Sequence, residues 1–338
     1  MTQDKQTREK QIESRPDGTA RHEAAVPFEQ AGLRLDQVLV ELFPGFSRSR
    51  LQTWLKDGAI LIDGAPRKPR DKMRGGEQVI LIEPAPEPDP MQAQPLPLNI
   101  VYEDDTLLVI DKPAGLVVHP AAGNHDGTLM NGLLHHAPEL AGIPRAGIVH
   151  RLDKETSGLL VVARTLSAHK DLVDQLQART VSREYLAVVN GHLVAGGTID
   201  EPMDRHPVDR KRMAVRHNGR EAITHYRVEE RFRAHTALRV KLETGRTHQI
   251  RVHMAYLKHP LIGDPTYGGR LRIPPDSDAD FVEVLRRFPR QALHALALGL
   301  IHPDTGEECR WESPIPDDIQ ALMQALRVDR DAHQESRP

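Results

Sequence analysis

Apolar residues near the start of the chain follow first a helical and then a strand-like spacing. Positions i, i+3, i+4 and i+7 are apolar from Leu35 onward, which is typical of an amphipathic helix. A second apolar stripe follows Ser47, a residue suited to cap a helix, and stops at Gly58. The pattern predicts helices at residues 35–42 and 48–57 and strands at 59–62 and 78–82. We therefore expect a small α+β domain over residues 27–83.

Three segments lack such a pattern. Residues 1–26 are rich in charge and poor in large apolar side chains, so we expect a disordered N-terminal tail. Residues 84–97 hold six prolines, which favour extended backbone and predict a semi-rigid linker. Residues 328–338 are expected to be a frayed C-terminal tail. A second, larger domain over residues 98–327 remains.

The second domain alternates strand-like runs with few helices. Apolar runs predict strands near residues 107–110, 159–163, 185–189 and 238–242. Helical spacing over residues 167–179 predicts a helix capped by Ser167. Because strands recur without regularly intervening helices, we expect a mixed α+β domain with a largely antiparallel sheet, not a doubly wound one.

A polar segment at residues 150–158 separates two short apolar runs, 146–149 and 159–163, which are typical of buried strands. Its one central carboxylate, Asp153, lies between Arg151 and Lys154. Loops held by rigid strands often carry function. Taken alone, the segment is compatible with either a solvated turn or an active site.

A second polar string runs from Thr244 to Met254. Gly245 turns the chain after a strand, and Thr247 is suited to cap the helix that follows. Arg246 then lies close to a helix N-terminus, where it either holds a carboxylate or phosphate or closes a surface salt bridge. His248 and His253 are five residues apart and do not share a helix face, so we expect no metal site.

Composition indicates an ordinary globular protein of a reducing compartment. Hydrophobic residues make up 39% and charged residues 28% of the 338 positions. Cys309 is the single cysteine, so no internal disulfide can form, and no apolar run is long enough to cross a bilayer. We expect a cytoplasmic protein without a membrane anchor.

Net charge is −3, but basic residues gather in two places. The clusters are Arg67, Lys68, Arg70, Lys72 and Arg74, and Arg205, Arg210, Lys211, Arg212, Arg216 and Arg220. Such clusters are either solvated faces or phosphate-binding surfaces. The presence of two of them slightly favours a protein that binds nucleic acid.

The sequence lacks the motifs that are typical of several classes of enzyme. The chain has no G-x-G-x-x-G, no P-loop and no G-x-S-x-G motif, which argues against nucleotide-dependent and serine-hydrolase chemistry. What remains as a catalytic candidate is a carboxylate acting with arginine and tyrosine, without a cofactor.

The motifs together resemble those of the RluA-type pseudouridine synthases, and the N-terminal module looks like an S4 RNA-binding domain. The resemblance spans about residues 27–325. It rests on the strings His150-Arg151-Leu152-Asp153 with Lys154 to Gly158, Asp111 to Gly115, Arg183-Glu184-Tyr185, Gly245 to Arg251, and Leu293-His294-Ala295. It implies an RNA-modifying isomerase that needs no cofactor and no metal.

The resemblance also implies roles for single residues. Asp153 matches the family's nucleophile, which attacks either the ribose C1′ or the uracil ring or helps to form a glycal. Arg246 matches the arginine that pairs with it, and Tyr185 matches the tyrosine that stacks on the flipped base. The implied RNA-binding residues are Arg48, Arg50, Arg67, Lys68, Arg70, Lys72, Arg74, Lys112, His150, Arg151 and Arg251.

Within the family, the S4-like module and the string Pro144 to Val149 are similar to a subfamily that acts on ribosomal RNA. This likeness implies a monomer that modifies uridines in the helix 69 loop of 23S RNA, in a large-subunit precursor or the 50S particle. A synthase of the same family that acts on tRNA is the alternative substrate class. A non-catalytic S4-type assembly factor is the alternative function.

Overall fold

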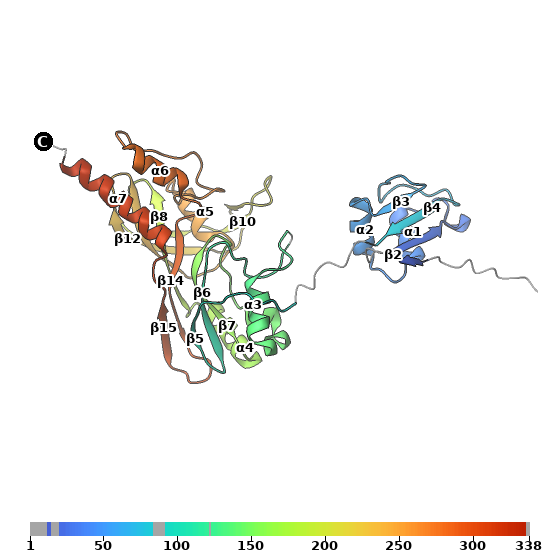
Figure 1. The fold of residues 1–338 in the computed structure, drawn as a ribbon, viewed down its shortest axis with the longest axis horizontal. Helices are drawn as coiled ribbons and strands as arrows, with labels where there is room; N and C mark the ends of the chain where they lie inside the picture. The colour runs from blue at the N-terminus through green and yellow to red at the C-terminus, as the bar shows by residue number, and fades with distance from the viewer. Residues whose placement is uncertain (1–11, 15–19, 84–91, 122, 336–338) are drawn as a thin grey trace, which may run out of the picture. The chain divides into compact units, whose positions relative to one another are not determined.

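The computed structural model describes residues 12–14, 20–83, 92–121 and 123–335 of the chain. It divides into two compact units, residues 1–87 and 88–338, which are described separately (Figure 1). Within the described parts, no helix is both long and apolar enough to cross a membrane.

The first unit is a small antiparallel sheet covered by two helices. Its strands are β1 (Ile12–Ser14), β2 (Ala20–Ala25), β3 (Ile60–Ile62) and β4 (Gln78–Ile82), in the order β1-β2-β4-β3. Helices α1 (Leu35–Leu42) and α2 (Arg48–Lys56) bury their apolar sides against β3 and β4. The Ser47 side chain accepts a hydrogen bond from Arg50 N at 3.4 Å, as expected of the cap. The predicted helices and strands of this unit are confirmed.

The expectation of a disordered tail over residues 1–26 is wrong for residues 20–25. These residues form β2, which pairs with β4 in a register that places Arg21 opposite Ile82 and Ala25 opposite Gln78. Backbone hydrogen bonds to β4 hold this polar strand, so it needs few apolar side chains of its own. The rest of the expected tail, apart from residues 12–14 and Val26, lies outside the described residues.

The predicted linker over residues 84–97 is also shorter than expected. Residues 84–91 lie outside the described part, whereas 92–97 pack on the second unit. Asn131 Nδ2 donates to Gln92 O at 2.7 Å, and Gln94 N donates to Asn131 O at 3.0 Å. A side chain on Gly132 would stand 3.1 Å from Leu96 Cβ, so this glycine admits the close approach. Pro95 and Pro97 therefore belong to a segment that packs on the second unit and not to a free linker.

The second unit is built on a nine-stranded sheet in the order β5-β6-β7-β14-β8-β13-β12-β9, with β15 paired to β14. The strands are β5 (Ile100–Glu103), β6 (Leu107–Lys112), β7 (Ser157–Ala163), β8 (Ser182–Asn190), β9 (Gly197–Asp200), β12 (Ile223–Arg231), β13 (His235–Leu242), β14 (Leu293–Ile301) and β15 (Glu308–Glu312). Of the strand pairs in the described sheet, β7 with β14 is parallel and the others are antiparallel. The predicted mixed α+β fold with a largely antiparallel sheet is confirmed.

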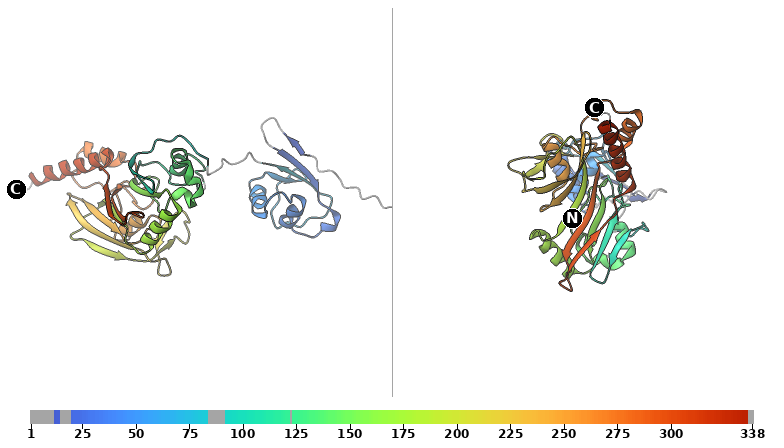
Figure 2. Two further views of the ribbon diagram at one scale, coloured as in Figure 1. Left: turned by 90° about the horizontal axis from the view of Figure 1, so that it is seen from below. Right: turned by 90° about the vertical axis from the view of Figure 1, so that its left-hand side faces the viewer.

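Helices cover both faces of this sheet (Figures 1 and 2). One face packs against α3 (Leu129–His136), the 3-10 turns Pro138–Gly142 and Pro144–Gly147, and α5 (Gln249–Tyr256). The other face packs against α4 (Leu166–Gln177) near β6 and β7. Near β8 and β13 it packs against α6 (Ala279–Arg287) and α7 (Asp317–Glu335). A hairpin of β10 (Met203–Arg205) and β11 (Met213–Val215) lies beside α5.

Two local expectations in this unit are wrong. The cap of α4 is Thr165, whose side chain accepts from Ala168 N at 3.0 Å, and not Ser167. Residues 146–149 are not a strand: Arg145 and Ala146 have φ of 55° and 51°, and Gly147 has φ of 78°. A Cβ on Gly147 would lie 1.9 Å from Ala163 O, so the turn presses against the end of β7. A short apolar run does not distinguish a buried turn from a strand.

The expected frayed tail at residues 328–338 is helical through Glu335, as the end of α7; residues 336–338 lie outside the described part. Ion pairs to the sheet hold this end of the helix. Arg330 Nη1 lies 3.0 Å from Glu230, and Asp329 lies 2.7 Å from Arg233 Nη2. These partners are about a hundred residues away in sequence, which is why local pattern did not predict the helix.

Candidate active site

The polar loop, residues 150–157, leads into β7 and is fixed to the core at four successive positions. Each position contacts one buried side chain from another element. The contacts are Lys112 Nζ to Lys154 O at 3.0 Å, Arg290 Nη1 to Glu155 O at 3.1 Å, Gln291 Nε2 to Thr156 Oγ1 at 3.1 Å, and Ser157 Oγ with His294 Nδ1 at 3.0 Å. Asp153 directly precedes these positions, so the backbone that carries its side chain is held in place.

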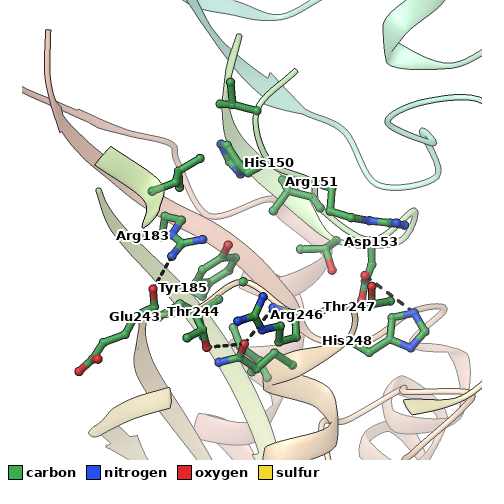
Figure 3. A pocket seen from close by; sticks show the side chains of 18 of the residues that line it. His150, Arg151, Asp153, Arg183, Tyr185, Glu243, Thr244, Arg246, Thr247 and His248 are labelled. Carbon is green, nitrogen blue, oxygen red and sulfur yellow. Dashed lines mark hydrogen bonds and ion pairs between the residues drawn. The ribbon is translucent and has the colours of Figure 1, made fainter. Parts of the chain in front are cut away.

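Asp153 lines a cavity of about 540 Å³ (Figure 3). At this cavity it contacts an arginine of α5. Arg251 Nη1 lies 3.0 Å from Asp153 Oδ2. The other side of the same guanidinium binds Asp264 through two hydrogen bonds, at 2.7 and 2.9 Å. Asp264 is held in turn by the backbone N–H groups of Thr266 and Tyr267. One arginine thus links a fully buried carboxylate to the carboxylate in the cavity.

Charge pairing in this triad outweighs the cost of burial. Burial alone would lower the pKa of Arg251, but hydrogen bonds and charge from Asp264, with the charge of Asp153, hold it above its usual value. Burial alone would raise the pKa of Asp264, but Arg251 keeps it lowered. The Asp264 side chain is 0% exposed and that of Asp153 is 14% exposed, so only Asp153 is accessible to a substrate.

His248 approaches Asp153 from the other side. It is the N-cap residue of α5, with a left-handed φ of 58°, and its Nε2 lies 3.9 Å from Asp153 Oδ1 (Figure 3). Its Nδ1 lies 2.9 Å from the hydroxyl of Tyr267. Burial lowers the pKa of His248, so the ring is mainly neutral near pH 7. Thr247, predicted as the cap, lines the cavity instead, and no side-chain cap bond is formed at this helix start.

Tyr185, on β8, supplies an aromatic wall to the cavity opposite Asp153 (Figure 3). It is 6% exposed, and burial raises the pKa of its phenol. Apolar side chains that line the same cavity include Leu242, Ile250 and Leu293. The cavity therefore combines a flat apolar surface with the Asp153 carboxylate, whereas the other acid of its lining, Glu243, pairs with Arg179 and His225. This combination is suited to a planar base attached to a sugar.

The predicted pair of Asp153 with Arg246 is not formed. Arg246 lines the cavity, but its Nε donates to Glu221 O at 2.9 Å, and the arginine on Asp153 is Arg251. Arg246 precedes α5, whereas Arg251 lies one turn into the helix, on its buried face. The two arginines share one motif, and sequence spacing did not distinguish which of them points to the polar loop.

The four predicted RNA-binding residues of the second unit separate into one exposed residue, two buried ones and one partly buried one. Arg151 is exposed at the cavity. Lys112 is 0% exposed and donates to three carbonyl groups, and Arg251 is committed to its two carboxylates, so neither is free to bind RNA. Burial lowers the pKa of His150 to about 3, and its Nε2 accepts from Val161 N at 3.1 Å. These three are structural parts of the site.

The predicted RNA-binding residues of the first unit lie at its surface. The basic loop, residues 66–74, exposes all five of its cationic side chains: Arg67, Lys68, Arg70, Lys72 and Arg74. Among the described residues, none of the five forms an ion pair. Arg48 pairs with the buried Asp36 at 2.9 Å while remaining exposed, and Arg50 lies over the Trp54 ring at 5.6 Å.

Sequence reasoning missed three polar side chains of the site. Asp264 follows a short apolar run and has no motif of its own, so only the contact with Arg251 reveals it. His248 was considered as a metal ligand alone, although it lies inside the string that carries Arg251. Arg183 stands two residues before Tyr185, and this strand spacing could have placed both on one face of the sheet.

The described residues hold no group of three or more His, Cys, Asp or Glu side chains placed to bind a metal ion. The chemistry that this arrangement offers directly is that of one carboxylate in a partly apolar cavity, beside an arginine, a neutral histidine and a tyrosine.

Comparison with known proteins gives a consistent result. Residues 106–256 match the RNA pseudouridylate synthase family, and residues 33–79 match the S4 domain. The chain is 60% identical over 309 residues to ribosomal large subunit pseudouridine synthase D of Pseudomonas aeruginosa, covering 91% of this chain and 97% of that protein. It is 53% identical over 313 residues to the protein of the same name from Escherichia coli K12, covering 92% and 96%.

Among solved structures, human RNA pseudouridylate synthase domain containing 4 is similar with a TM-score of 0.54 and 26% identity, over 68% of this chain and 93% of that one. The family match over residues 106–256 includes Asp153 and Arg251.

Proposed function

Since the chain belongs to the RNA pseudouridylate synthase family and is an RNA pseudouridine synthase, we propose that its substrate is ribosomal RNA of the large subunit. The proposal rests on the identity of 60% and 53% to two proteins named ribosomal large subunit pseudouridine synthase D. We propose the helix 69 loop of 23S RNA as the target, modified by a monomer in the cytoplasm. Loop uridines suit an enzyme that must take the base out of its stack, because unstacking is cheapest there.

Asp153 is the nucleophile in this proposal. The single observation that carries it is the 3.0 Å pair with Arg251 at the cavity that Asp153 lines. A carboxylate nucleophile must be ionised, and an adjacent guanidinium favours that form. The flipped uridine would stack on Tyr185 with its sugar toward Asp153. The N1–C1′ bond breaks, the ring turns and C5 bonds to C1′. The C5 proton is lost to solvent and N1 takes up a proton, so the product is an isomer of the substrate.

The order of these steps follows one of three routes. Asp153 attacks C1′ and displaces the ring, or attacks the uracil ring first, or assists formation of a glycal. In each route the reaction exchanges one carbon–nitrogen bond for one carbon–carbon bond without a net redox change.

The basic loop and the exposed Arg48 and Arg50 serve in this proposal to bind the RNA backbone. Their charges are accessible to phosphates, which give affinity rather than choice of sequence. Arg151, at the cavity, would contact RNA next to the flipped nucleotide.

The test compares Asp153→Asn with Asp105→Asn, which neutralises an exposed carboxylate outside the cavity lining. We expect Asp153→Asn to reduce pseudouridine formation on a large-subunit RNA fragment by more than about 1,000-fold and Asp105→Asn to leave it unchanged. Formation is scored by a chemical adduct that stops reverse transcription. Residual activity of Asp153→Asn near wild type would refute the nucleophile.

The substrate is tested separately in cells that lack this protein. We expect pseudouridine to disappear from the helix 69 loop and to remain at other ribosomal positions and in tRNA. Loss in tRNA with unchanged ribosomal RNA would refute the proposed substrate and support the tRNA alternative.

A further inference from the structure

Arg183 lines the cavity as a buried cation, and among the described residues it has no carboxylate partner. It is 6% exposed and lies on β8, two residues before Tyr185, so both side chains extend from the same face of the strand (Figure 3). Its Nη2 donates to Glu243 O at 3.0 Å, and its buried Nε has no hydrogen-bond partner among the described residues. A guanidinium has five donors, so most of its bonding capacity is unused by the protein.

The neighbouring acids are committed elsewhere. The Glu243 carboxylate pairs with Arg179 at 3.0 Å and with His225 at 2.6 Å, and extends away from Arg183 (Figure 3). Glu184 alternates to the opposite face of β8, where it pairs with Arg239 at 3.2 Å.

The titratable groups that face Arg183 are neutral near pH 7. The charge of Arg183 adds to burial in lowering the pKa of His150 to about 3, and burial raises the pKa of Tyr185. Burial lowers the pKa of Arg183 itself, which is the direction expected of a cation that no acid neutralises.

Gly245 makes room for this unpaired cation. A Cβ at Gly245 would stand 2.7 Å from Arg183 Nη1, closer than side-chain atoms approach. The glycine before Arg246 is therefore needed for more than a turn, because it leaves room for the Arg183 guanidinium beside the strand-to-helix connection. A buried charge without a partner costs folding free energy, so a site that keeps one, and keeps space for it, points to a function in the reaction.

We propose that Arg183 stabilises the negative charge that develops on the uracil ring during the reaction. The inference rests on the proposed function and deepens it. When the N1–C1′ bond breaks, its electron pair stays on N1 and spreads to O2 and O4 of the ring; attack at C6 would likewise move an electron pair toward O4. Every route for Asp153 thus produces an anionic ring beside Tyr185. A fixed guanidinium in a partly apolar cavity stabilises such an anion.

The alternative role for Arg183 is to bind a phosphate of the flipped nucleotide. A phosphate contact exists before and during the reaction, so its loss weakens binding. Stabilisation of a developing anion acts in the transition state and changes the rate of the chemical step. The two roles are separable by measurement.

The experiment measures single-turnover cleavage of the N-glycosidic bond in a helix 69 hairpin RNA that carries labelled uridine or labelled 5-fluorouridine at the target position. Fluorine withdraws electrons and stabilises the ring anion without help from the enzyme. We expect Arg183→Met to slow cleavage of uridine by about 100-fold and of 5-fluorouridine by about 10-fold or less, with RNA Kd changed by less than about threefold. Arg183→Lys, which keeps the charge, should recover most of the rate.

A double-mutant cycle with Gly245→Ala tests the position of the charge. The added methyl displaces the flexible end of Arg183, so we expect about a 10-fold loss in the wild-type background and none in the Arg183→Met background. Thermal unfolding should show Arg183→Met to be at least as stable as wild type, because it removes an unpaired buried cation.

Three outcomes would each overturn the assignment. Arg183→Met slows cleavage of uridine and 5-fluorouridine equally, or it weakens RNA binding without slowing cleavage, or Gly245→Ala still lowers the rate in the Arg183→Met background. If the wild-type enzyme forms no pseudouridine in ribosomal RNA, the proposed function fails and the assignment fails with it. An active wild type with any of the three outcomes refutes the assignment alone.

Discussion

The polar loop of the second unit and the basic loop of the first are both surface connections rich in charge, and they are built in opposite ways. In the polar loop, residues 154–157 each contact a buried side chain from elsewhere in the fold, and Asp153 is paired with Arg251. The basic loop has local ties, such as the bond from Lys68 N to Asp71 at 2.9 Å, while its cations face solvent. Chemistry needs a fixed reacting atom, whereas phosphate binding needs accessible charge.

Removing Arg251, the arginine of α5 that pairs with Asp153 of the polar loop, should produce the largest effect. Arg251→Met leaves Asp264 buried without a counter-charge and frees Asp153. We expect a loss of about 3–5 kcal/mol in the free energy of unfolding and at least a 100-fold loss in the rate of the chemical step. Chemical denaturation and single-turnover assays of folded enzyme measure the two.

Arg246→Met is the matched control, because Arg246 lines the same cavity and belongs to the same motif. It loses one hydrogen bond to a carbonyl group, so we expect a change in unfolding free energy within about 1 kcal/mol. If Arg246→Met were the more destabilising variant of the two, the pairing of Asp153 and Asp264 with Arg251 would be contradicted.

The same contrast explains what could be predicted from sequence. The apolar periodicity around α1 and along β13, and the motif that carries Asp153, are local and were predicted correctly. The partner of Asp153 was not, because Arg246 and Arg251 lie in one motif and only the path of α5 decides which one reaches the loop. Asp264 and the donors Arg290 and Gln291 are more than a hundred residues from Asp153, and no local pattern marks them.

The errors at the chain ends have the same origin. Polar segments such as β2 and the end of α7 are ordered by backbone pairing and by distant ion partners. Composition predicts whether a segment can order itself, not whether another segment orders it.

Lys112 allows a second test of how firmly the polar loop is held. Burial lowers its pKa from 10.5 to about 8 in the folded protein. Between these values the unfolded chain binds more protons than the folded one, so this group makes stability rise with pH from about 8 to 10.5. The charged lysine is a cost to the fold below pH 8, and its three carbonyl partners offset that cost.

We therefore expect wild type to gain stability relative to Lys112→Met as pH rises from 8 to 10, by up to about 1.4 kcal/mol per pH unit. Urea denaturation at a series of pH values measures the difference between the two slopes. Parallel slopes would contradict the lowered pKa of Lys112, because they would mean that its three carbonyl partners offset the whole cost of burying the charged lysine. Lys56→Met, which removes an exposed lysine of the first unit, is the control for the loss of a lysine side chain.

Changes in the basic loop should have the opposite effect: they should weaken RNA binding and leave the free energy of unfolding nearly unchanged. Reversing Arg67, Lys68 and Arg70 to Glu removes three accessible cations that form no ion pair within the described residues. We expect RNA binding to weaken about 10- to 100-fold at low salt and the slope of log Kd against log salt to fall by about 2–3, with unfolding free energy changed by less than about 0.5 kcal/mol.

Filter binding over a range of salt concentrations measures both quantities, with Lys56→Glu as the control for a cation of the same unit outside the basic loop. The rate of the chemical step at saturating RNA should stay near wild type, because the cavity is untouched. A triple variant that binds RNA normally but fails in the chemical step would overturn the division between the two loops. It would mean that charge on the first unit acts on the reaction itself, and that binding and catalysis in this enzyme are not separable.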